Sequence, residues 1–196
     1  MGRRLFSETS SEPEWWMDSM LEAYLAGRTP FASEIATWST LDLEIDHYLS
    51  DERPPDHLVT SARAVVLASE RVLVIQDPTG DEHIIPGGRR RAGESLEDTV
   101  RREVLEETCW TVEELSILAV SHFHITSAVP EEYPYPSPDF LQLIYLTSAL
   151  QHDTERSIED GWVAGCELLP VDSLQEGRLS ISQRLLLAQA VSRARA

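Results

Sequence analysis

The chain has 196 residues, 42% of them hydrophobic and 26% charged, which suffices for one domain with a real core plus an appendage. Its formal net charge of -18 argues against non-specific binding to nucleic acid or to an anionic membrane, whereas small phosphorylated substrates stay compatible because bound metal ions invert the local field. The two cysteines, Cys109 and Cys166, provide no disulfide framework and predict a reduced, cytoplasmic setting. No apolar run is long enough to span a membrane, so no membrane partner is expected.

Two helices are expected before the main domain, because large apolar residues repeat there at helical spacing. The first begins at Pro13 and ends at Gly27, and the second runs from Thr29, a cap followed by proline, to Asp51. Their apolar positions are Trp16, Met20 and Tyr24 in the first helix and Phe31, Ile35, Trp38, Leu41, Ile45 and Tyr48 in the second. Residues 1–55 are therefore predicted to form a helical extension that packs on the main domain or on a second copy in a homodimer. Covering the substrate is the less favoured interpretation.

Residues 56–196 are predicted to form the main domain. Strands are expected at 57–68, 71–76, 115–125, 139–149 and 162–169, and a closing helix at 179–194 with Leu185, Leu186 and Ala190 toward the core. In the third strand, alternation places His122 and His124 on one face. Hydrogen-bonded roles are favoured for these histidines over contact with a substrate. Mixed strands and helices in this order indicate an α+β class, an α/β/α sandwich.

Between the second and third strands, residues 86–110 join a glycine-rich loop to an amphipathic helix. Ser95 is expected to cap the helix, and Leu96, Val100 and Val104 to anchor it to a sheet. Three carboxylates, those of Glu103, Glu106 and Glu107, fall on one arc of the helix, although nothing in the helix itself requires them there. Arg102 is expected to orient this cluster, with Asp98 as its ion-pair partner.

A solvated acidic face would be the better explanation for three glutamates alone, but for three glutamates that follow this glycine-rich loop the binding of a hard divalent cation explains the cluster better. Mg²⁺ is held in proteins by a few carboxylates, waters and substrate phosphates. A backbone carbonyl at Gly87 is a further candidate ligand, because glycine lets the main chain approach closely.

The same stretch resembles the signature of the Nudix hydrolases, G-x5-E-x7-R-E-U-x-E-E-x-G-U with U a bulky apolar residue. The residues that fall on it in register are Gly88, Glu94, Arg102, Glu103, Val104, Glu106, Glu107 and Trp110. Cys109 stands where the signature has glycine, so either the helix ends differently here or the position is strained. The resemblance covers about 58–187 and implies the Nudix fold, a sandwich with a mixed sheet.

By implication the reaction is hydrolysis of a nucleoside diphosphate linked to another moiety, with Mg²⁺ or alternatively Mn²⁺ as the cofactor. The resemblance implies that Glu103, Glu106 and Glu107 bind the metal, with Gly87 as a further ligand. It also implies that these three glutamates and Arg102 form the catalytic set. Gly88 and Glu94 would support the loop. Which acid is the general base stays open. A non-catalytic nucleotide-binding module is the alternative from another class, and an isomerase of isoprenoid diphosphates is a weaker enzymatic one.

Two further groups are candidate substrate contacts. Arg89, Arg90 and Arg91 follow the glycines directly, where arginine suits bidentate recognition of phosphate. A solvated turn that balances nearby glutamates is an equally weighted interpretation. Tyr133 and Tyr135 lie in a proline-rich loop, residues 127–138, and are predicted to stack on a base or sugar, against the equal alternative of a rigid surface loop. The expected partner is a small phosphorylated nucleotide.

Overall fold

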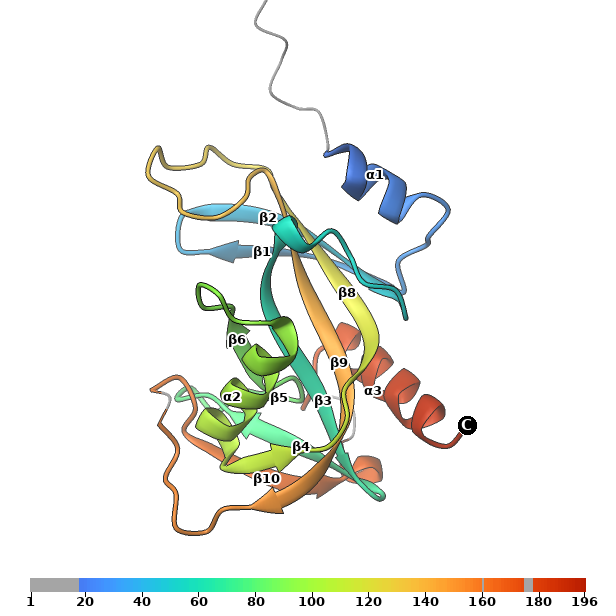
Figure 1. Cartoon of the computed structure of the whole chain (residues 1–196), viewed down its shortest axis with the longest axis vertical. Helices are drawn as coiled ribbons and strands as arrows, with labels where there is room; N and C mark the ends of the chain where they lie inside the picture. The colour runs from blue at the N-terminus through green and yellow to red at the C-terminus, as the bar shows by residue number, and fades with distance from the viewer. Residues whose placement is uncertain (1–17, 160, 175–177) are drawn as a thin grey trace, which may run out of the picture.

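One mixed sheet dominates the computed structural model, which describes residues 18–159, 161–174 and 178–196 (Figure 1). The main path of the sheet has the order β1-β2-β8-β9-β3-β4-β10, and β5, β6 and β7 pair with β4, β3 and β9. The strands are β1 (Ala32–Trp38), β2 (Leu41–Leu49), β3 (Val59–Ala68), β4 (Arg71–Gln76), β5 (Glu82–His83), β6 (Gly87–Arg89), β7 (Trp110–Val112), β8 (Ser116–Ile125), β9 (Asp139–His152) and β10 (Gly165–Pro170). The helices are α1 (Ser19–Leu25), α2 (Leu96–Thr108) and α3 (Ile181–Ala194), with 3-10 turns at Asp56–Leu58 and Val171–Ser173. β3 and β9 run parallel, and the other paired strands run antiparallel.

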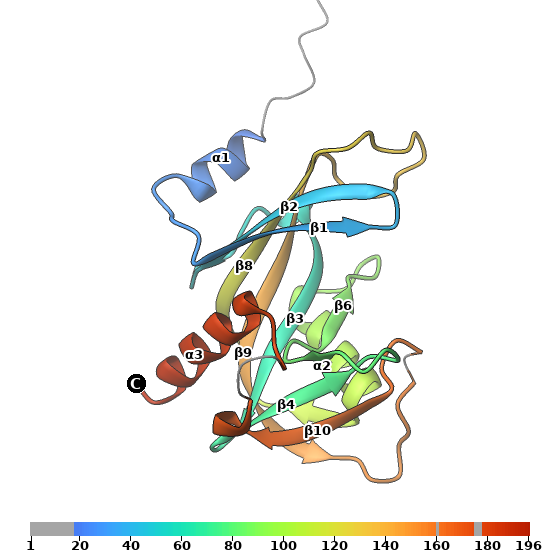
Figure 2. The same cartoon turned by 180° about the vertical axis from the view of Figure 1, so that it is seen from behind.

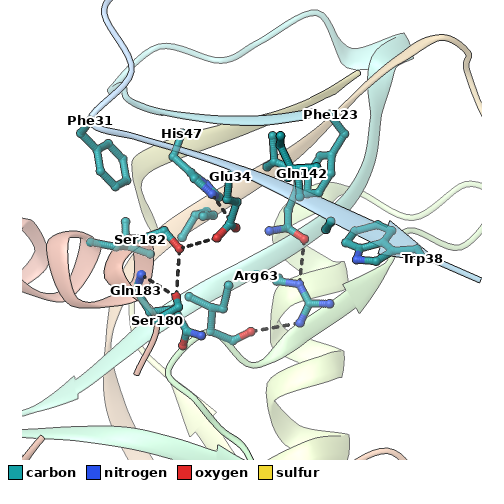
Figure 3. Close-up of a pocket in the computed structure, with 16 residues that line it drawn as sticks. Phe31, Glu34, Trp38, His47, Arg63, Phe123, Gln142, Ser180, Ser182 and Gln183 are labelled. Carbon is teal, nitrogen blue, oxygen red and sulfur yellow. Dashed lines mark hydrogen bonds and ion pairs between the residues drawn. The ribbon is translucent and has the colours of Figure 1, made fainter. Parts of the chain in front are cut away.

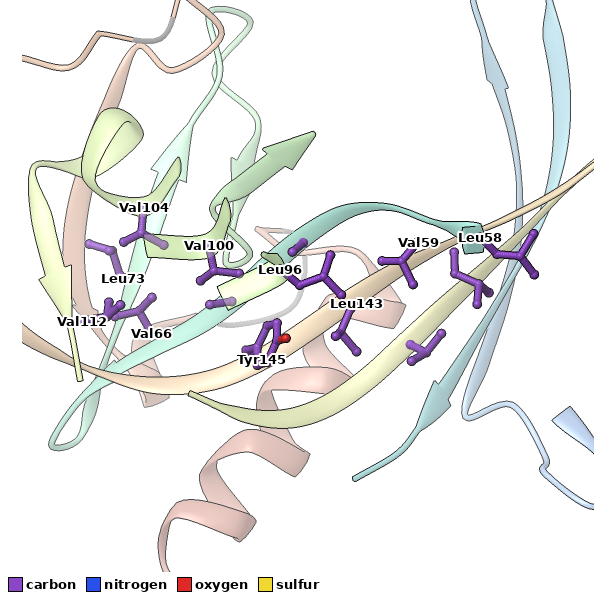
Figure 4. Packing of buried hydrophobic residues seen from close by; sticks show 14 of the residues in the cluster. Leu58, Val59, Val66, Leu73, Leu96, Val100, Val104, Val112, Leu143 and Tyr145 are labelled. Atoms are coloured by element: carbon purple, nitrogen blue, oxygen red, sulfur yellow. The ribbon is translucent and has the colours of Figure 1, made fainter. Parts of the chain in front are cut away.

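The helix α2 covers one face of the sheet. Its hydroxyl cap is Ser95, whose Oγ accepts a hydrogen bond from the Asp98 N–H, as expected. The predicted stripe of Leu96, Val100 and Val104 is fully buried and packs in one cluster with residues of β3, β4 and β9 (Figure 4). This packing fixes α2 over β3, and with it the orientation of the acidic arc of the helix.

The helix α3 covers the opposite face of the sheet, as the view from behind shows (Figure 2). Val65 and Val66 are neighbours on β3, yet Val65 packs with α3 and Val66 packs with α2, because successive side chains of a strand point to opposite faces. Leu186 and Ala190 are buried as expected. Leu185 is 41% exposed, so its expected place in the core is wrong.

The predicted second helix, from Thr29 to Asp51, is wrong. This segment is the antiparallel hairpin β1–β2, and β2 pairs with β8 so that the hairpin extends the main sheet. The sequence of β2 fits a period of two as well as it fits the helical period. Along the strand, exposed Asp42 and Glu44 alternate with buried Leu43 and Ile45. Ile35, which the helical pattern put on a buried face, is 82% exposed. Pairing with a distant strand decided between the two periods.

The first predicted helix is confirmed over Ser19–Leu25, and its residues 13–17, Trp16 among them, lie outside the described residues. In the part of the extension that the structure describes, residues 18–55, α1 is the only helix, and the hairpin that follows belongs to the same sheet as the main domain. The division at residue 55 itself stays a prediction. Within the described ranges, no helix combines the length and the apolar character that crossing a membrane requires.

Candidate active site

The glycine-rich loop enters β6, which pairs with β3 beside α2. Gly87 has φ of +139°, and a Cβ there would lie 2.6 Å from the Cα of Arg63, so this position requires glycine. A Cβ on Gly88 would lie 2.7 Å from Oε2 of Glu103. The N–H of Gly87 also donates a 2.8 Å hydrogen bond to Oε2 of Glu107. The two glycines therefore bring the loop backbone into contact with two carboxylates of α2.

Arg102 lies at the centre of the acidic cluster. Its Nε and Nη2 donate to the two oxygens of Glu94, over 2.7 and 2.9 Å. Its Nη1 donates to Oε1 of Glu103 over 2.6 Å and to Oε2 of Glu106 over 3.1 Å. The predicted partner Asp98 is wrong, because that carboxylate accepts a 2.6 Å hydrogen bond from the Ser95 hydroxyl at the helix cap. Arg102 thus connects the loop residue Glu94 to the helix glutamates.

The bidentate bond from Arg102 lowers the pKa of Glu94 to about 2, although partial burial opposes this shift. The backbone N–H of Arg91 and the hydroxyl of Thr99 add further hydrogen bonds to the same carboxylate. The same contacts raise the pKa of Arg102 above its ordinary value. Glu94 therefore carries its charge at every physiological pH and holds the loop and Arg102 together.

The oxygen atoms of the cluster suit a hard divalent cation. Glu103, Glu106 and Glu107 offer carboxylate oxygens, and the backbone carbonyl of Gly87 belongs to the adjacent loop. Across the described ranges, however, no three acidic, histidine or cysteine side chains are already arranged to hold a metal ion. The reason is that Glu103 and Glu106 face Arg102, while Glu107 faces the Gly87 N–H.

The three arginines after the glycines point to three different partners. The guanidinium of Arg89 lies 3.9 Å from the ring centroid of Tyr135, a cation–π contact. Arg90 pairs with Asp56 over 2.8 Å and donates from Nε to the Glu94 carbonyl, so it anchors the loop. Nη2 of Arg91 lies 3.3 Å from Glu106 at the edge of the cluster. The structure thus places Arg89 and Arg91, but not Arg90, where a phosphorylated ligand beside the cluster would meet them.

A pocket of about 360 Å³ opens next to the glycine loop. Gly88, Arg89, Tyr133 and Tyr135 all line this glycine-loop pocket, so it unites predicted residues from two separate segments. The two tyrosines pack edge to face, with ring centroids 5.5 Å apart. The rest of its aromatic wall, which the sequence analysis did not assign to a site, consists of Trp38, Phe123 and Phe140.

A second pocket, of about 300 Å³, lies between the hairpin, the sheet and the start of α3 (Figure 3). This hairpin pocket shares Trp38, Arg63, Phe123 and Gln142 with the glycine-loop pocket, so the two are neighbouring parts of one groove. Arg63 is fixed in the shared wall, because Nε donates to Oε1 of Gln142 over 2.8 Å and Nη1 to the Ile85 carbonyl over 3.1 Å. The sequence analysis missed this pocket, and the alternation of period two in residues 41–49 was the signal for the hairpin that forms one side of it.

The histidines of β8 have the hydrogen-bonded role that was expected. His122 and His124 both contact Oδ1 of Asp139, over 2.7 and 2.8 Å. Burial raises the pKa of Asp139, but the bonds from the two histidines outweigh it and the net shift is downward. This trio joins β8 to the start of β9 at the base of the loop that carries the tyrosines.

Cys109 ends α2 in the left-handed conformation, with φ of 60° and ψ of 15°. Its N–H donates to the Leu105 carbonyl over 3.0 Å, the pattern of a C-terminal αL cap. The side chain is buried, and its sulfur lies 3.5 Å from the carbonyl oxygen of Arg156. Of the two expectations for this position, the structure shows the strained backbone. The helix therefore ends as it would with glycine.

Comparison with known proteins agrees with this geometry. The family model of the NUDIX domain matches residues 57–190. Among solved structures, a NUDIX hydrolase from Nitrosomonas europaea is 17% identical, with a TM-score of 0.54 over 69% of this chain and 90% of that one. The Bacillus subtilis pyrophosphohydrolase BsRppH, as a mutant, is 16% identical, with a TM-score of 0.56 over 78% and 92%. At these identities the likeness shows a shared fold. No curated protein sequence matches.

Proposed function

The chain belongs to the Nudix family, and we propose that it is a hydrolase that acts on a phosphoanhydride, that its substrate is a nucleoside diphosphate linked to another moiety, and that the reaction depends on Mg²⁺ or Mn²⁺. The observation that carries this proposal is the position of the cluster. Glu103 and Glu107 lie against the two glycines, and one of these glycines, Gly88, also lines a pocket with Arg89 and aromatic rings. If the diphosphate of the substrate lay at the loop, the attached base or sugar would be within reach of that pocket.

In this proposal Glu103, Glu106 and Glu107 hold the metal, with the Gly87 carbonyl as a further ligand. The chemistry that the metal supplies when bound is neutralisation of phosphate charge and a lower pKa for the attacking water. Arg102 orients Glu103 and Glu106 through its two bonds from Nη1. One carboxylate of the site accepts the proton of the water. Arg89, at the rim of the glycine-loop pocket, binds a phosphate oxygen of the substrate.

Cys109, the one departure from the signature, is the feature of the sequence that favours a non-catalytic module. That residue adopts the left-handed conformation that a glycine would adopt, and the carboxylates of α2 are all in place. Cys109 therefore no longer supports loss of catalysis. The homodimer stays a prediction, which sedimentation equilibrium of the full chain would check.

The test is a screen of ADP-ribose, nucleotide sugars, dinucleoside polyphosphates and nucleoside triphosphates with the full chain in the presence of Mg²⁺. We expect one class to yield two phosphorylated products, and Glu106→Gln to lower the rate by about 10²-fold or more, because a charge at the transition state loses its support. Glu114→Gln, which changes an exposed acid outside the cluster, is the matched control. Binding of a nucleotide without turnover in every class would instead establish the non-catalytic module.

A further inference from the structure

The hairpin β1–β2 precedes the part of the chain that the family model matches, yet it builds one side of the groove. Glu34 and Trp38 lie four residues apart on β1, so alternation puts both on the same face. Both line the hairpin pocket, and Figure 3 shows their side chains on the side of β1 that faces Arg63 and Gln142. At about 3.4 Å per residue the two positions are about 14 Å apart along the strand.

Glu34 is held in place but still accessible. Its Oε1 contacts Nε2 of His47 over 3.0 Å, and its Oε2 accepts a 3.3 Å hydrogen bond from the Ser182 hydroxyl. Its side chain is nevertheless 41% exposed, and a carboxylate offers about four acceptor positions. The fixed carboxylate can therefore accept hydrogen bonds from a ligand, and because it is only an acceptor it selects ligands that present N–H groups.

Trp38 forms the wall between Glu34 and the glycine loop. Its ring packs on Phe123 with centroids 5.1 Å apart, while 47% of the residue stays exposed. Since Trp38 lines both pockets, a ligand that starts at Gly88 and Arg89 passes Trp38 before it reaches Glu34. The order along the groove is thus phosphate-binding arginine, aromatic wall, and carboxylate.

We propose that Glu34 determines the specificity of the enzyme for a nucleobase that bears an exocyclic amino group. The base lies in the hairpin pocket with its amino group donating to Glu34, its sugar lies against Trp38, and the diphosphate lies at the glycine loop. This inference rests on the proposed function, because it uses the diphosphate at the loop to set the direction of the ligand. Adenine donates to Glu34 from its exocyclic amino group, whereas hypoxanthine carries a carbonyl oxygen at that ring position and cannot form this hydrogen bond.

The test compares binding of ADP, IDP and inorganic pyrophosphate to the full chain by calorimetry, with EDTA present so that no turnover occurs. We expect ADP to bind about tenfold more tightly than IDP, the size of one hydrogen bond to a charged group, and pyrophosphate to bind more weakly than ADP. In Glu34→Gln the amide keeps an acceptor for His47 and presents N–H groups to the pocket, so the preference for ADP over IDP should disappear or invert. Glu44→Gln, on the other face of the same hairpin and exposed, should leave the preference unchanged.

Equal binding of ADP and IDP by the wild type, or an unchanged ratio in Glu34→Gln, would overturn the inference. Pyrophosphate binding as tightly as ADP would overturn it too, because the base would then contribute nothing. The outcome is separable from that of the substrate screen. Discrimination that depends on Glu34 in a protein without hydrolytic activity upholds this inference and refutes the proposed function, and hydrolysis without discrimination does the reverse.

Discussion

Substituting Cys109 by glycine and by alanine would measure the strain at the end of α2. Both variants remove the buried sulfur, so they differ only in the Cβ atom that meets the left-handed backbone at φ of 60°. A left-handed conformation costs a residue with a Cβ roughly 1–2 kcal/mol relative to glycine, against about 1 kcal/mol in favour of alanine at an ordinary helical position. We therefore expect Cys109→Gly to be more stable than Cys109→Ala by about 1 kcal/mol. Relative to the wild type, Cys109→Gly should be about equal, since the relief of strain offsets the lost burial of the thiol.

Urea denaturation followed by circular dichroism gives both free energies of unfolding. Arg101, an exposed residue inside the same helix, is the matched control: there the alanine variant should be the more stable by about 1 kcal/mol. The reversal of sign between the two positions is the result to look for. If Cys109→Gly were no more stable than Cys109→Ala, the left-handed end of α2 would be refuted. Catalysis should persist in Cys109→Gly, because Glu107 and the other carboxylates precede the substituted residue.

Three more outcomes are expected. Gly87→Ala should lower the free energy of unfolding by about 2 kcal/mol or more, measured by urea denaturation, because the new Cβ meets the backbone of β3 at an unfavourable φ; a neutral effect would contradict this. Glu107→Gln should keep the Gly87 N–H bond and the fold but lower the Mg²⁺-dependent rate by about 10²-fold, and a normal rate at saturating Mg²⁺ would argue against a metal ligand. Since the pKa of Glu94 falls from 4.5 to about 2 on folding, its stabilising contribution is complete above pH 4.5 and is lost as the pH falls toward 2. Unfolding of Glu94→Gln should therefore depend less on pH in this range, and identical acid titrations of both proteins would count against the Arg102 pair.

Local patterns predicted the features that depend on local geometry. The cap at Ser95 follows from the capping preference of serine and the buried stripe of α2 follows from the helical period, and both are confirmed. The longer strands of the main domain were likewise readable, because alternation and turns bound them, and β4 occupies Arg71–Gln76 as predicted. The short strands β5, β6 and β7 were not predicted. The order of strands and helices indicated the α+β class, and the signature implied the Nudix fold.

Partners brought together from distant segments were not readable. The segment 29–51 satisfies both the helical and the strand period, and only its pairing with β8 decides between them. Arg102 pairs with Glu94 because the loop turns back over the helix. The spacing of residues along the helix does not reveal the course of this loop. For the same reason, the sequence offered no indication that Trp38 would meet Tyr133 and Tyr135 in one pocket.

The hairpin also sets an order of events during synthesis. It ends at Leu49, whereas the strand that covers it, β8, begins at Ser116, so the ribosome finishes the hairpin well before its partner exists. An isolated two-stranded hairpin is marginally stable in water, and contacts between residues so far apart in the chain form slowly. Leu43 and Ile45 are buried in the native protein. During synthesis they are therefore exposed to non-native contacts until after α2 has been made. The segment that shapes the groove therefore depends on protection from aggregation before folding is complete.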